Sequence, residues 1–391
     1  MKSILVLHPQ FDTLGGAELL ALRIVSWLVS QYGARVCLLA LGEVNLKQVQ
    51  SQAELVFPQG SVTTRAAPCP AWIRNREGSL HLLRLAYLSR EAKRIADEFD
   101  LCISTYNEVD FGRPGFQYVH HPNFLSRAFF HRYSMIGTKN ILDFLPLLER
   151  LYGIAVSRIS KNSVEGFRMN RTAVNSEFMK QILFQEYAID STVLYPAFLQ
   201  AASVSTLTRW EERRNRFVSI GRFSHDKNFL ELVDLFKLLS ERLSDATFTI
   251  VGRLGDKAYY RRVAERARRV GVPVEFCTNI SNDQLQEILQ TSKYYIGPKK
   301  FEHFGLAVLE AARAGCLTFV HDSGGQREII TPPELRYATP QELVVKVTAL
   351  GSDGHLRKNV FAEMWRGITK FRLDDFYRNL GSILKPLLEK P

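Results

Sequence analysis

Short runs of β-branched and apolar residues alternate with amphipathic stretches along most of this 391-residue chain. The run Ser3–Leu7 is followed by Ala17–Gln31, where apolar residues recur at helical spacing, and then by the run Arg35–Ala40. This β-α-β order predicts a mostly parallel sheet covered by helices on both faces. The first half has further candidate strands at Leu101–Thr105, Phe116–Val119, Arg171–Asn175 and Thr192–Leu194.

The alternation lapses after Pro196 and then resumes. The stretch "AFLQAASVSTLTRWEERRNR" is first rich in Ser and Thr and then heavily charged, as linkers between domains often are. Candidate strands in the second half are Phe217–Ile220, Thr247–Val251, Val274–Phe276, Tyr294–Gly297 and Leu317–Val320. A chain of this length exceeds the roughly 250 to 300 residues that one core supports.

We therefore expect an α/β fold with two Rossmann-like domains facing a central cleft. The expected N-terminal domain covers residues 1–195, and a linker covers residues 196–215. The second domain is expected at residues 216–370, and residues 371–391 contain a helical pattern from Asp374 to Leu388.

The net charge of +11 points to anionic partners such as phosphates, nucleic acid or acidic lipid, and a merely basic, solvated surface is the alternative. No zinc finger, RRM-like motif or base-reading helix is present, so we expect no nucleic-acid partner. Arg23 interrupts the longest apolar run, so no membrane span is predicted. The five cysteines form no CxxC pair, which favours a reducing, cytoplasmic location, including the cytoplasmic face of a membrane.

Ligands of open parallel sheets bind beyond the carboxyl ends of the strands. After the first strand, Gly15 and Gly16 precede a helix, where backbone N–H groups can face an anion. A plain loop-to-helix turn is the alternative. In the second half, "GRFSHDKN" places Arg222 and Lys227 after a strand, where a guanidinium and an ammonium can neutralise a diphosphate. A solvated basic turn is the alternative there.

The stretch "KKFEHFGLAVLEAARAG" carries two carboxylates, Glu302 in a loop and Glu310 inside a helix that starts near Phe304. Each can accept paired hydrogen bonds from a vicinal diol, one on a sugar ring and the other on a ribose. The next strand ends in "HDSGGQRE", which is expected to expose backbone donors before a short helix.

In the first half, "YVHHPN" places His120 and His121 directly after a strand. Adjacent side chains on an extended segment point to opposite sides, so one of the two faces the cleft, and we favour His120. Histidine shares a proton near neutral pH more readily than any other side chain. A structural, hydrogen-bonded histidine is the alternative.

Taken in order, "GRFSHDKN", "EHFGLAVLE" and "SGGQRE" resemble the donor site of the family-4 retaining glycosyltransferases of GT-B fold. The resemblance is strongest to the eukaryotic α-1,2-mannosyltransferases that use GDP-mannose to extend the lipid-linked oligosaccharide on dolichol diphosphate. It runs from about His8 to Glu328, and "HPQFDTLGGAE", "YVHHP", "VNSEF", "VLYP" and "VEFCTNI" contribute to it. Much of residues 41–100 has no counterpart, "HHPN" replaces a HYP-type segment, and the membrane anchor usual at the start of those enzymes is missing from this sequence.

This resemblance implies roles for individual residues. Arg222 and Lys227, in the turn led by Gly221, would hold the donor diphosphate, and Glu310 would bind the ribose. Glu302 would bind the hydroxyls of the donor sugar. Gly15 and Gly16 would lie against the diphosphate, and His120 would lie near the transferred sugar. Phe304, Gly305 and Leu306 would lie beside the sugar and phosphate. Asn279 and Ile280 would lie near the base.

The resemblance further implies C-terminal helices packing back, with the helix at residues 371–391 returning towards the N-terminal domain. It also implies a retaining transfer of mannose from GDP-mannose to a glycan or polyprenyl-linked acceptor. Because no DxD motif occurs, we expect neither a metal nor a cofactor. A UDP-sugar donor carrying glucose or N-acetylglucosamine is the alternative, and a catalytically idle relative that binds nucleotide or glycan is another. Two amphipathic basic stretches, residues 71–94 and 124–140, favour peripheral contact with an anionic membrane over ordinary helices with one buried face.

Overall fold

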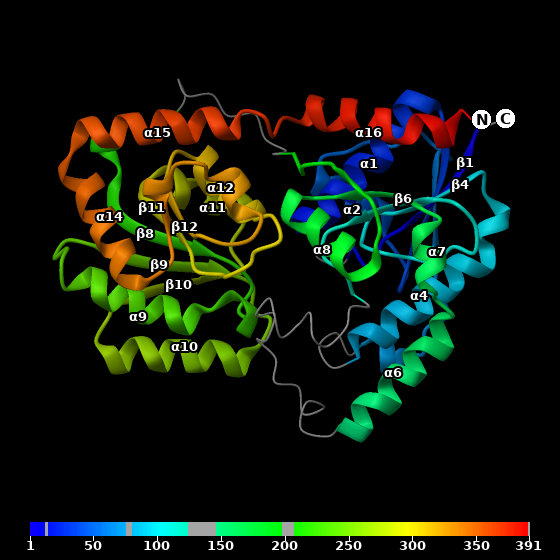
Figure 1. Ribbon diagram of the computed structural model, residues 1–391, viewed down its shortest axis with the longest axis horizontal. Helices are drawn as coiled ribbons and strands as arrows, with labels where there is room; N and C mark the ends of the chain where they lie inside the picture. Colours follow the sequence, from blue (N-terminus) through cyan, green and yellow to red (C-terminus); the bar gives the residue numbers. More distant parts are fainter. Residues whose placement is uncertain (12–14, 76–79, 124–145, 198–206, 390–391) are drawn as a thin grey trace. The chain divides into compact units, whose positions relative to one another are not determined.

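Two parallel sheets organise the chain, and the predicted α/β fold is confirmed. The computed structural model describes residues 1–11, 15–75, 80–123, 146–197 and 207–389. Within them, strands β1 to β7 and the segment from Asp374 onwards form one unit, and β8 to β13 with their helices as far as Leu373 form another (Figure 1).

The first unit has a seven-stranded sheet in the order β3-β2-β1-β4-β5-β6-β7. All of its strand pairs are parallel, with Leu5 opposite Cys37 of β2 and Cys102 of β4. Its elements are β1 (Ser3–Leu7), α1 (Gly16–Tyr32), β2 (Arg35–Ala40), α2 (Leu46–Ala53), β3 (Val62–Ala66), α3 (Ala71–Arg74), α4 (His81–Ile95), β4 (Leu101–Ser104), β5 (Phe116–Val119), α6 (Pro146–Ser160), α7 (Val164–Arg168), β6 (Arg171–Val174), α8 (Glu177–Tyr187) and β7 (Thr192–Val193).

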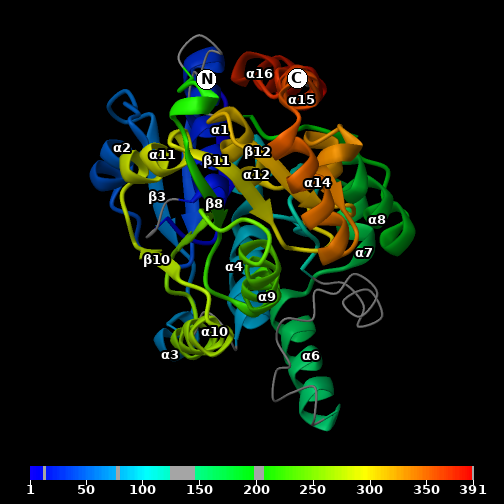
Figure 2. The ribbon, with the colours of Figure 1, turned by 90° about the vertical axis from the view of Figure 1, so that its left-hand side faces the viewer.

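The second unit has a six-stranded parallel sheet in the order β10-β9-β8-β11-β12-β13. Helices α9 and α10 pack on each other along one side of it, as Figures 1 and 2 both show. Its elements are β8 (Arg214–Ile220), α9 (Phe229–Ser240), β9 (Thr247–Gly252), α10 (Lys257–Val270), β10 (Val274–Thr278), α11 (Asn282–Gln290), β11 (Ser292–Gly297), α12 (Leu306–Arg313), β12 (Leu317–His321), α13 (Gln326–Ile329), β13 (Arg336–Tyr337), α14 (Pro340–Ser352) and α15 (Gly354–Ile368).

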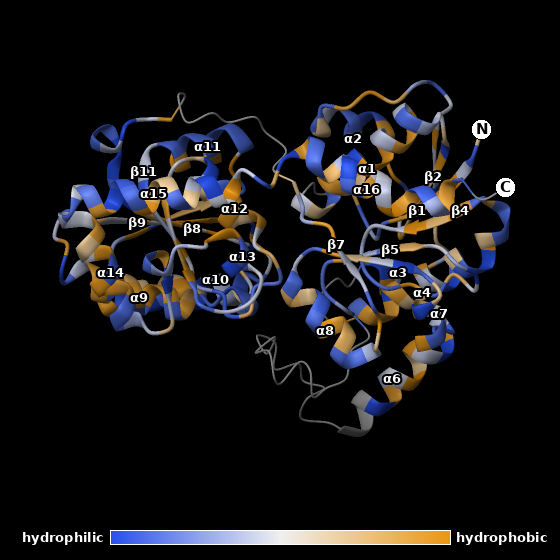
Figure 3. Cartoon of the chain, turned by 45° about the horizontal axis from the view of Figure 1, so that its top comes forward, coloured by the Kyte–Doolittle hydropathy of each residue, from blue (hydrophilic) through white to orange (hydrophobic). Residues whose placement is uncertain are grey.

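The helices begin and end where local chemistry requires. The side chain of Asp256 caps α10 by accepting hydrogen bonds from two backbone amides of its first turn, and Gly271 ends that helix with φ of +70°. Figure 3 shows hydrophobic colours on the strands and hydrophilic colours along α10. Each sheet is therefore the centre of a core, and the loops at the strand ends remain available for function.

Three details differ from the sequence predictions. Strand β8 begins at Arg214, inside the segment predicted as a linker, and residues 198–206 of that segment lie outside the described residues. Helix α12 begins at Leu306 rather than near Phe304, because Gly305 is its N-cap. Strands β3 and β13 were not predicted.

The last helix, α16 (Leu373–Leu388), packs its apolar face on the first unit. Its Tyr377 ring stacks on Trp27 of α1 with 6.1 Å between ring centroids. Gly381 lies under the same indole, since a Cβ there would be 3.4 Å from Trp27 Cζ2. The C-terminal helix is therefore part of the first unit's core, although the chain reaches it after the second unit.

Candidate active site

The turn after β8 carries the two predicted cations of the second unit. A Cβ on Gly221 would lie 3.2 Å from the Lys227 side chain, so the glycine lets the lysine stem pass close to the backbone. The stem of Arg222 crosses Gly255 in the same way, 2.6 Å from a Cβ placed there. Arg222 is exposed, and among the described residues its guanidinium has no hydrogen bond or ion pair.

Glu302 is held by two lysines, one on each carboxylate oxygen. Lys227 Nζ donates to Oε2 at 3.0 Å, and Lys299 Nζ donates to Oε1 at 3.2 Å. Asp226 lies beyond Lys299, with 3.8 Å between Asp226 Oδ2 and Nζ. Burial raises the pKa of Glu302, but Lys227 and Lys299 more than offset that effect and hold the pKa well below its ordinary value. Glu302 is therefore ionised at neutral pH.

The "SGGQRE" loop fixes the backbone of this glutamate. Ser323 Oγ accepts from the amide of Phe301 at 2.8 Å, and the amide of Gly325 donates to the Glu302 carbonyl at 2.8 Å. Gly324 has φ of +72°, and a Cβ there would lie 2.5 Å from the Glu302 carbonyl oxygen. The expectation that this loop exposes its donors is wrong for Gly325, because the Glu302 carbonyl takes that amide.

Glu310, four residues into α12, has an environment opposite to that of Glu302. Burial raises the pKa of its carboxyl to about 7, and no hydrogen bond or ion pair joins it to the rest of the described chain. A half-buried acceptor without a partner among the described residues suits a ligand hydroxyl. The two glutamates thus differ in charge environment, as expected for carboxylates with separate partners rather than for a catalytic dyad.

The remaining predicted donor residues line the same strand ends. Gly305, with φ of +109°, caps α12 and leaves the first-turn amides, including that of Leu306, outside the intrahelical hydrogen bonds. Phe304 is only 2% exposed and packs edge-on against Phe371, so its side chain belongs to the core. Asn279, with φ of +56°, and the half-buried Ile280 follow β10.

In the first unit, the glycine turn is tied to a buried histidine. The Gly15 amide donates to Glu18 Oε2 at 2.9 Å, so this donor does not face outwards as the sequence suggested. The other Glu18 oxygen lies 3.8 Å from Nε2 of the fully buried His8. Gly16 is the first residue of α1 and follows this turn directly.

His120 is held by Thr105. Its Nε2 lies 3.2 Å from the Thr105 carbonyl, which can only accept, so Nε2 carries the proton. Burial, helped by the nearby His8, lowers the pKa of His120 to about 4. The imidazole is therefore neutral at pH 7, and the expected proton sharing near neutral pH is wrong for this environment. His121 contacts Asn107 instead, with 3.3 Å between Nδ1 and Nδ2.

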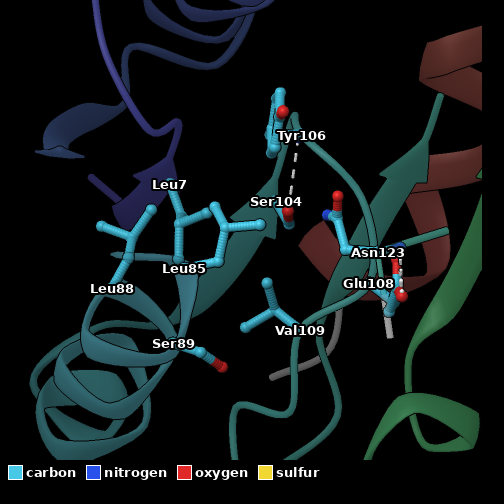
Figure 4. A pocket seen from close by; sticks show the side chains of 9 residues that line it. All are labelled: Leu7, Leu85, Leu88, Ser89, Ser104, Tyr106, Glu108, Val109 and Asn123. Atoms are coloured by element: carbon cyan, nitrogen blue, oxygen red, sulfur yellow. Dashed lines mark hydrogen bonds between the residues drawn. The ribbon is translucent and has the colours of Figure 1, made fainter. Parts of the chain in front are cut away.

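A small, mostly apolar pocket lies at the carboxyl ends of β1 and β4 (Figure 4). Its polar groups include the Ser104 hydroxyl and Asn123 Oδ1, which is buried and has no hydrogen-bond partner within the part of the chain that the structure describes. The residues that line it are Leu7, Leu85, Leu88, Ser89, Ser104, Tyr106, Glu108, Val109 and Asn123. It has room for about one water molecule, so it is a gap in the core beside the strand ends rather than a site for a glycan.

The two stretches predicted to touch a membrane differ in what the structure shows. Residues 124–140 lie outside the described residues. In residues 71–94, the apolar side of α4 is buried in the core, as the alternative held, whereas Trp72 of α3 is 66% exposed. Across the described residues, every helix is too short or too polar to cross a bilayer.

Sequence reasoning missed Lys299, Asp226 and the pair His8 and Glu18. The sequence does show Lys299 three residues before Glu302, in the same motif. The environment of His8 could not be predicted from the sequence. Its Nδ1 lies 3.0 Å from Thr105 Oγ1, and Thr105 is 97 residues away in the chain.

Comparison with known proteins adds sequence relatives. Residues 207–361 match the family model of the group 1 glycosyl transferases. The chain is 28% identical over 170 residues to the GDP-Man:Man(3)GlcNAc(2)-PP-Dol alpha-1,2-mannosyltransferase of Dictyostelium discoideum, covering 40% of this chain and 34% of that protein. It is 33% identical over 128 residues to the mouse protein of the same name, covering 30% and 26%. These matches span about a third or less of either relative.

A solved structure extends the comparison to the whole fold. The crystal structure of Anabaena HepE in complex with UDP and glucose matches with a TM-score of 0.66 at 16% identity, covering 98% of this chain and 100% of that chain. At this identity the likeness concerns the fold alone. The architecture of two parallel sheets is thus shared over the full chain, whereas the sequence relationship covers less than half of it.

Proposed function

We propose, from the premise that residues 207–361 form a group 1 glycosyltransferase segment, that the protein transfers a hexose from a nucleotide sugar to an acceptor hydroxyl. The proposed donor is GDP-mannose, and the proposed acceptor is a glycan or a polyprenyl-linked glycan. The observation that carries the proposal is the group of cations around an ionised glutamate after strands β8 and β11.

Charge supports a diphosphate ligand. Arg222, Lys227 and Lys299 face two carboxylates, those of Asp226 and Glu302, so the described cluster has an excess of one positive charge. Arg222 can form a bidentate contact with phosphate without breaking an ion pair. The first-turn amides of α12 add further donors for an anion.

The two glutamates would recognise hydroxyls at either end of the donor. Glu302 is ionised and positioned by its loop, which suits hydrogen bonds from the sugar hydroxyls. Glu310 is half-buried and its carboxyl has no partner among the described residues, which suits the ribose hydroxyls. Each carboxylate has two oxygens and can accept both hydrogen bonds of a vicinal diol.

In the proposed reaction, the bond between sugar C1 and the diphosphate oxygen breaks and a bond from C1 to the acceptor oxygen forms. The acceptor proton passes to an oxygen of the departing diphosphate, on the same face of the sugar, so the configuration at C1 is retained. Arg222 and Lys227 would stabilise the negative charge that grows on the leaving group, which is usually the largest catalytic effect. This neutralisation is proposed to proceed without a metal.

Sequence likeness to proteins named as GDP-mannose-dependent mannosyltransferases favours mannose. The structural likeness to a protein solved with UDP and glucose supports the second candidate, a UDP-sugar donor. The residues around Asn279 would read the base, and neither the diphosphate site nor the glutamates distinguish the two donors.

The acceptor would bind at the first unit. The neutral His120 follows β5 at the carboxyl edge of its sheet. A neutral imidazole with a proton on Nε2 can orient a hydroxyl but does not act as an acid at pH 7. The net charge of +11 and the exposed Trp72 support peripheral contact with anionic lipid.

The test is transfer of labelled mannose from GDP-mannose, and of labelled glucose from UDP-glucose, into lipids extracted from membranes. Label from mannose should enter the lipid fraction with wild-type protein and fall by at least about 10²-fold with Lys227→Ala. Entry of glucose alone would move the function to the second candidate. Absence of label from both donors would contradict a lipid-linked acceptor.

A further inference from the structure

Lys299 and Lys227 both form ion pairs with Glu302, and the proposed function assigns Lys227 to the donor diphosphate. The side chain of Lys299 is only 14% exposed, and its Nζ lies 3.2 Å from Glu302 Oε1 and 3.8 Å from Asp226 Oδ2. Lys227 takes the other oxygen of Glu302 at 3.0 Å. As the structure stands, each oxygen of the glutamate therefore has its own ammonium.

The donor diphosphate would compete for one of these two lysines. Lys227 is the cation assigned to the phosphates, and its ammonium cannot give its full set of hydrogen bonds to both Glu302 and a diphosphate. When the diphosphate binds, the Glu302 carboxylate would therefore lose part of the positive charge that neutralises it. At the same time, its oxygens must accept hydrogen bonds from the sugar hydroxyls. A buried carboxylate without a counter-ion is costly and tends to take up a proton.

Lys299 can stay in place through this exchange. Its carbonyl accepts from Gln326 Nε2 at 2.9 Å, and Gln326 is 1% exposed. Three residues later, the Glu302 carbonyl accepts from Gly325. The backbone is thus held at both ends of the Lys299 to Glu302 segment, so the ion pair does not depend on the position of Lys227.

We propose that Lys299 is a positioning residue that keeps Glu302 ionised and oriented towards the donor sugar while Lys227 engages the diphosphate. The proposal rests on the proposed function and gives the cations of this site two separate roles. Lys227 and Arg222 would serve the leaving group, and Lys299 would serve sugar recognition through Glu302.

Other charged and titratable groups also face this glutamate. Lys227 from the turn after β8, Tyr295 from β11 and the adjacent His303 interact with it directly. Asp226 acts on Lys227 and Lys299, Arg222 acts on Lys227 and Asp226, and Glu310 acts on Tyr295. Asp226 opposes Lys299 and therefore reduces its effect on Glu302. Removing the Lys299 ammonium leaves Lys227 as the main counter-ion, so the carboxyl should protonate at higher pH.

The experiment compares Lys299→Met with Lys300→Met in the full chain, by calorimetric titration of GDP and GDP-mannose, or of UDP and UDP-glucose if wild-type protein prefers them. Lys300 is the matched control, because it is adjacent, 41% exposed and paired instead with Glu231 at 3.8 Å. Lys299→Met should weaken the nucleotide sugar about tenfold and change the nucleoside diphosphate less than about twofold. Lys300→Met should change neither, and Lys299→Arg should recover most of the loss.

The pH profile separates this role from a merely structural one. Loss of nucleotide-sugar binding at acid pH should begin at a higher pH in Lys299→Met than in wild type, because one of the two ammonium groups that favour the ionised carboxylate is gone. Equal weakening of GDP and GDP-mannose, or an unmoved acid limb, would overturn the inference while leaving the proposed function intact. A folded wild-type protein that binds no nucleotide sugar would overturn the proposed function and this inference with it.

Discussion

Residue environments separate the two glutamates more sharply than their positions in the sequence do. Glu302 has a lysine on each oxygen, whereas burial alone acts on Glu310 and raises its pKa to about 7. Both were predicted as hydroxyl acceptors from one motif. Their different protonation behaviour could not be predicted, because it depends on side chains from the turn after β8 and on the depth of α12.

Glu310→Gln is expected to stabilise the protein above neutral pH. The folded-state pKa of about 7 lies above the ordinary value of 4.5, so the folded state keeps a proton that the unfolded state releases. The free energy of unfolding therefore falls as pH rises from about 4.5 to 7. At pH 8 the variant should gain about 1 to 3 kcal/mol in urea unfolding, and little at pH 4. The exposed Glu287→Gln is the control, and an equal gain in it would contradict this reading.

The same substitution should reduce nucleotide affinity. The ionised carboxylate is the better acceptor for ribose hydroxyls, so wild-type affinity should rise as pH increases through about 7. Glu310→Gln should bind about tenfold more weakly at pH 8 and lose this pH dependence. Calorimetric titrations at pH 6 and pH 8 measure both effects, and a variant that kept the wild-type slope would exclude Glu310 as its source.

Arg222→Ala should weaken GDP and GDP-mannose by the same factor, about tenfold or more, because a phosphate contact is common to both ligands. The exposed Arg242, which follows α9, provides the control for loss of one positive charge. Titration at two salt concentrations distinguishes a direct contact from a diffuse field, which salt screens. A loss confined to GDP-mannose would place Arg222 at the sugar instead.

At the scale of elements, the loop Ser323–Gly325 is a support for Glu302 rather than a ligand site of its own. The sequence showed two glycines and suggested free donors, but the structure shows close backbone packing on residues 301 and 302. Such packing joins loops after neighbouring strands β11 and β12. It follows from sheet order, which the sequence of a single loop does not contain.

Gly324→Ala should therefore damage function beyond its cost in stability. Its positive φ makes any side chain strained by about 1 kcal/mol, and the new Cβ would meet the Glu302 backbone at 2.5 to 2.7 Å. Gly271→Ala is a matched control, since φ is +70° and nothing lies within 4 Å of its Cβ. Both variants should lower Tm, but only Gly324→Ala should weaken nucleotide-sugar binding. Normal binding by Gly324→Ala would contradict the supporting role.

The strands show which elements a sequence pattern can predict. Interior strands such as β1 and β5 were predicted with their observed bounds, because burial on both faces favours mostly apolar residues; the buried Gln117 of β5 is an exception. Strands β3 and β13 were missed, and both are edge strands. In β3 most residues are exposed or half-buried, so "VTTRA" gives only a weak hydrophobic signal.

At the scale of the whole molecule, the chain leaves the first unit after β7 and returns to it with α16. The amphipathic pattern of Asp374–Leu388 predicted a helix, and the resemblance implied its return. The fold and the likeness to glycosyltransferases are confirmed over the ranges that match. The donor sugar and the acceptor stay predictions, because their recognition depends on a few loop residues that vary between enzymes of one fold.

Leu380→Ala tests whether α16 belongs to the core of the first unit. Leu380 is fully buried, so the substitution should destabilise the first unit by about 2 to 5 kcal/mol and leave the second unit's own core unchanged. Differential scanning calorimetry should show one transition move down. Val345→Ala, at a 67% exposed site of α14, should move neither transition by more than about 1 °C. A loss confined to the second unit would contradict the assignment.

The central claim is that the second unit binds a nucleoside diphosphate through the turn after β8. The most direct measurement is thermal unfolding of wild-type protein and Lys227→Ala with GDP, UDP and ADP at equal concentration. A ligand at about 100 times its Kd adds roughly 2.7 kcal/mol to the free energy of unfolding. We predict selective stabilisation of wild-type protein by GDP and its loss in the variant. An unfolding temperature unchanged by all three nucleotides would contradict the claim.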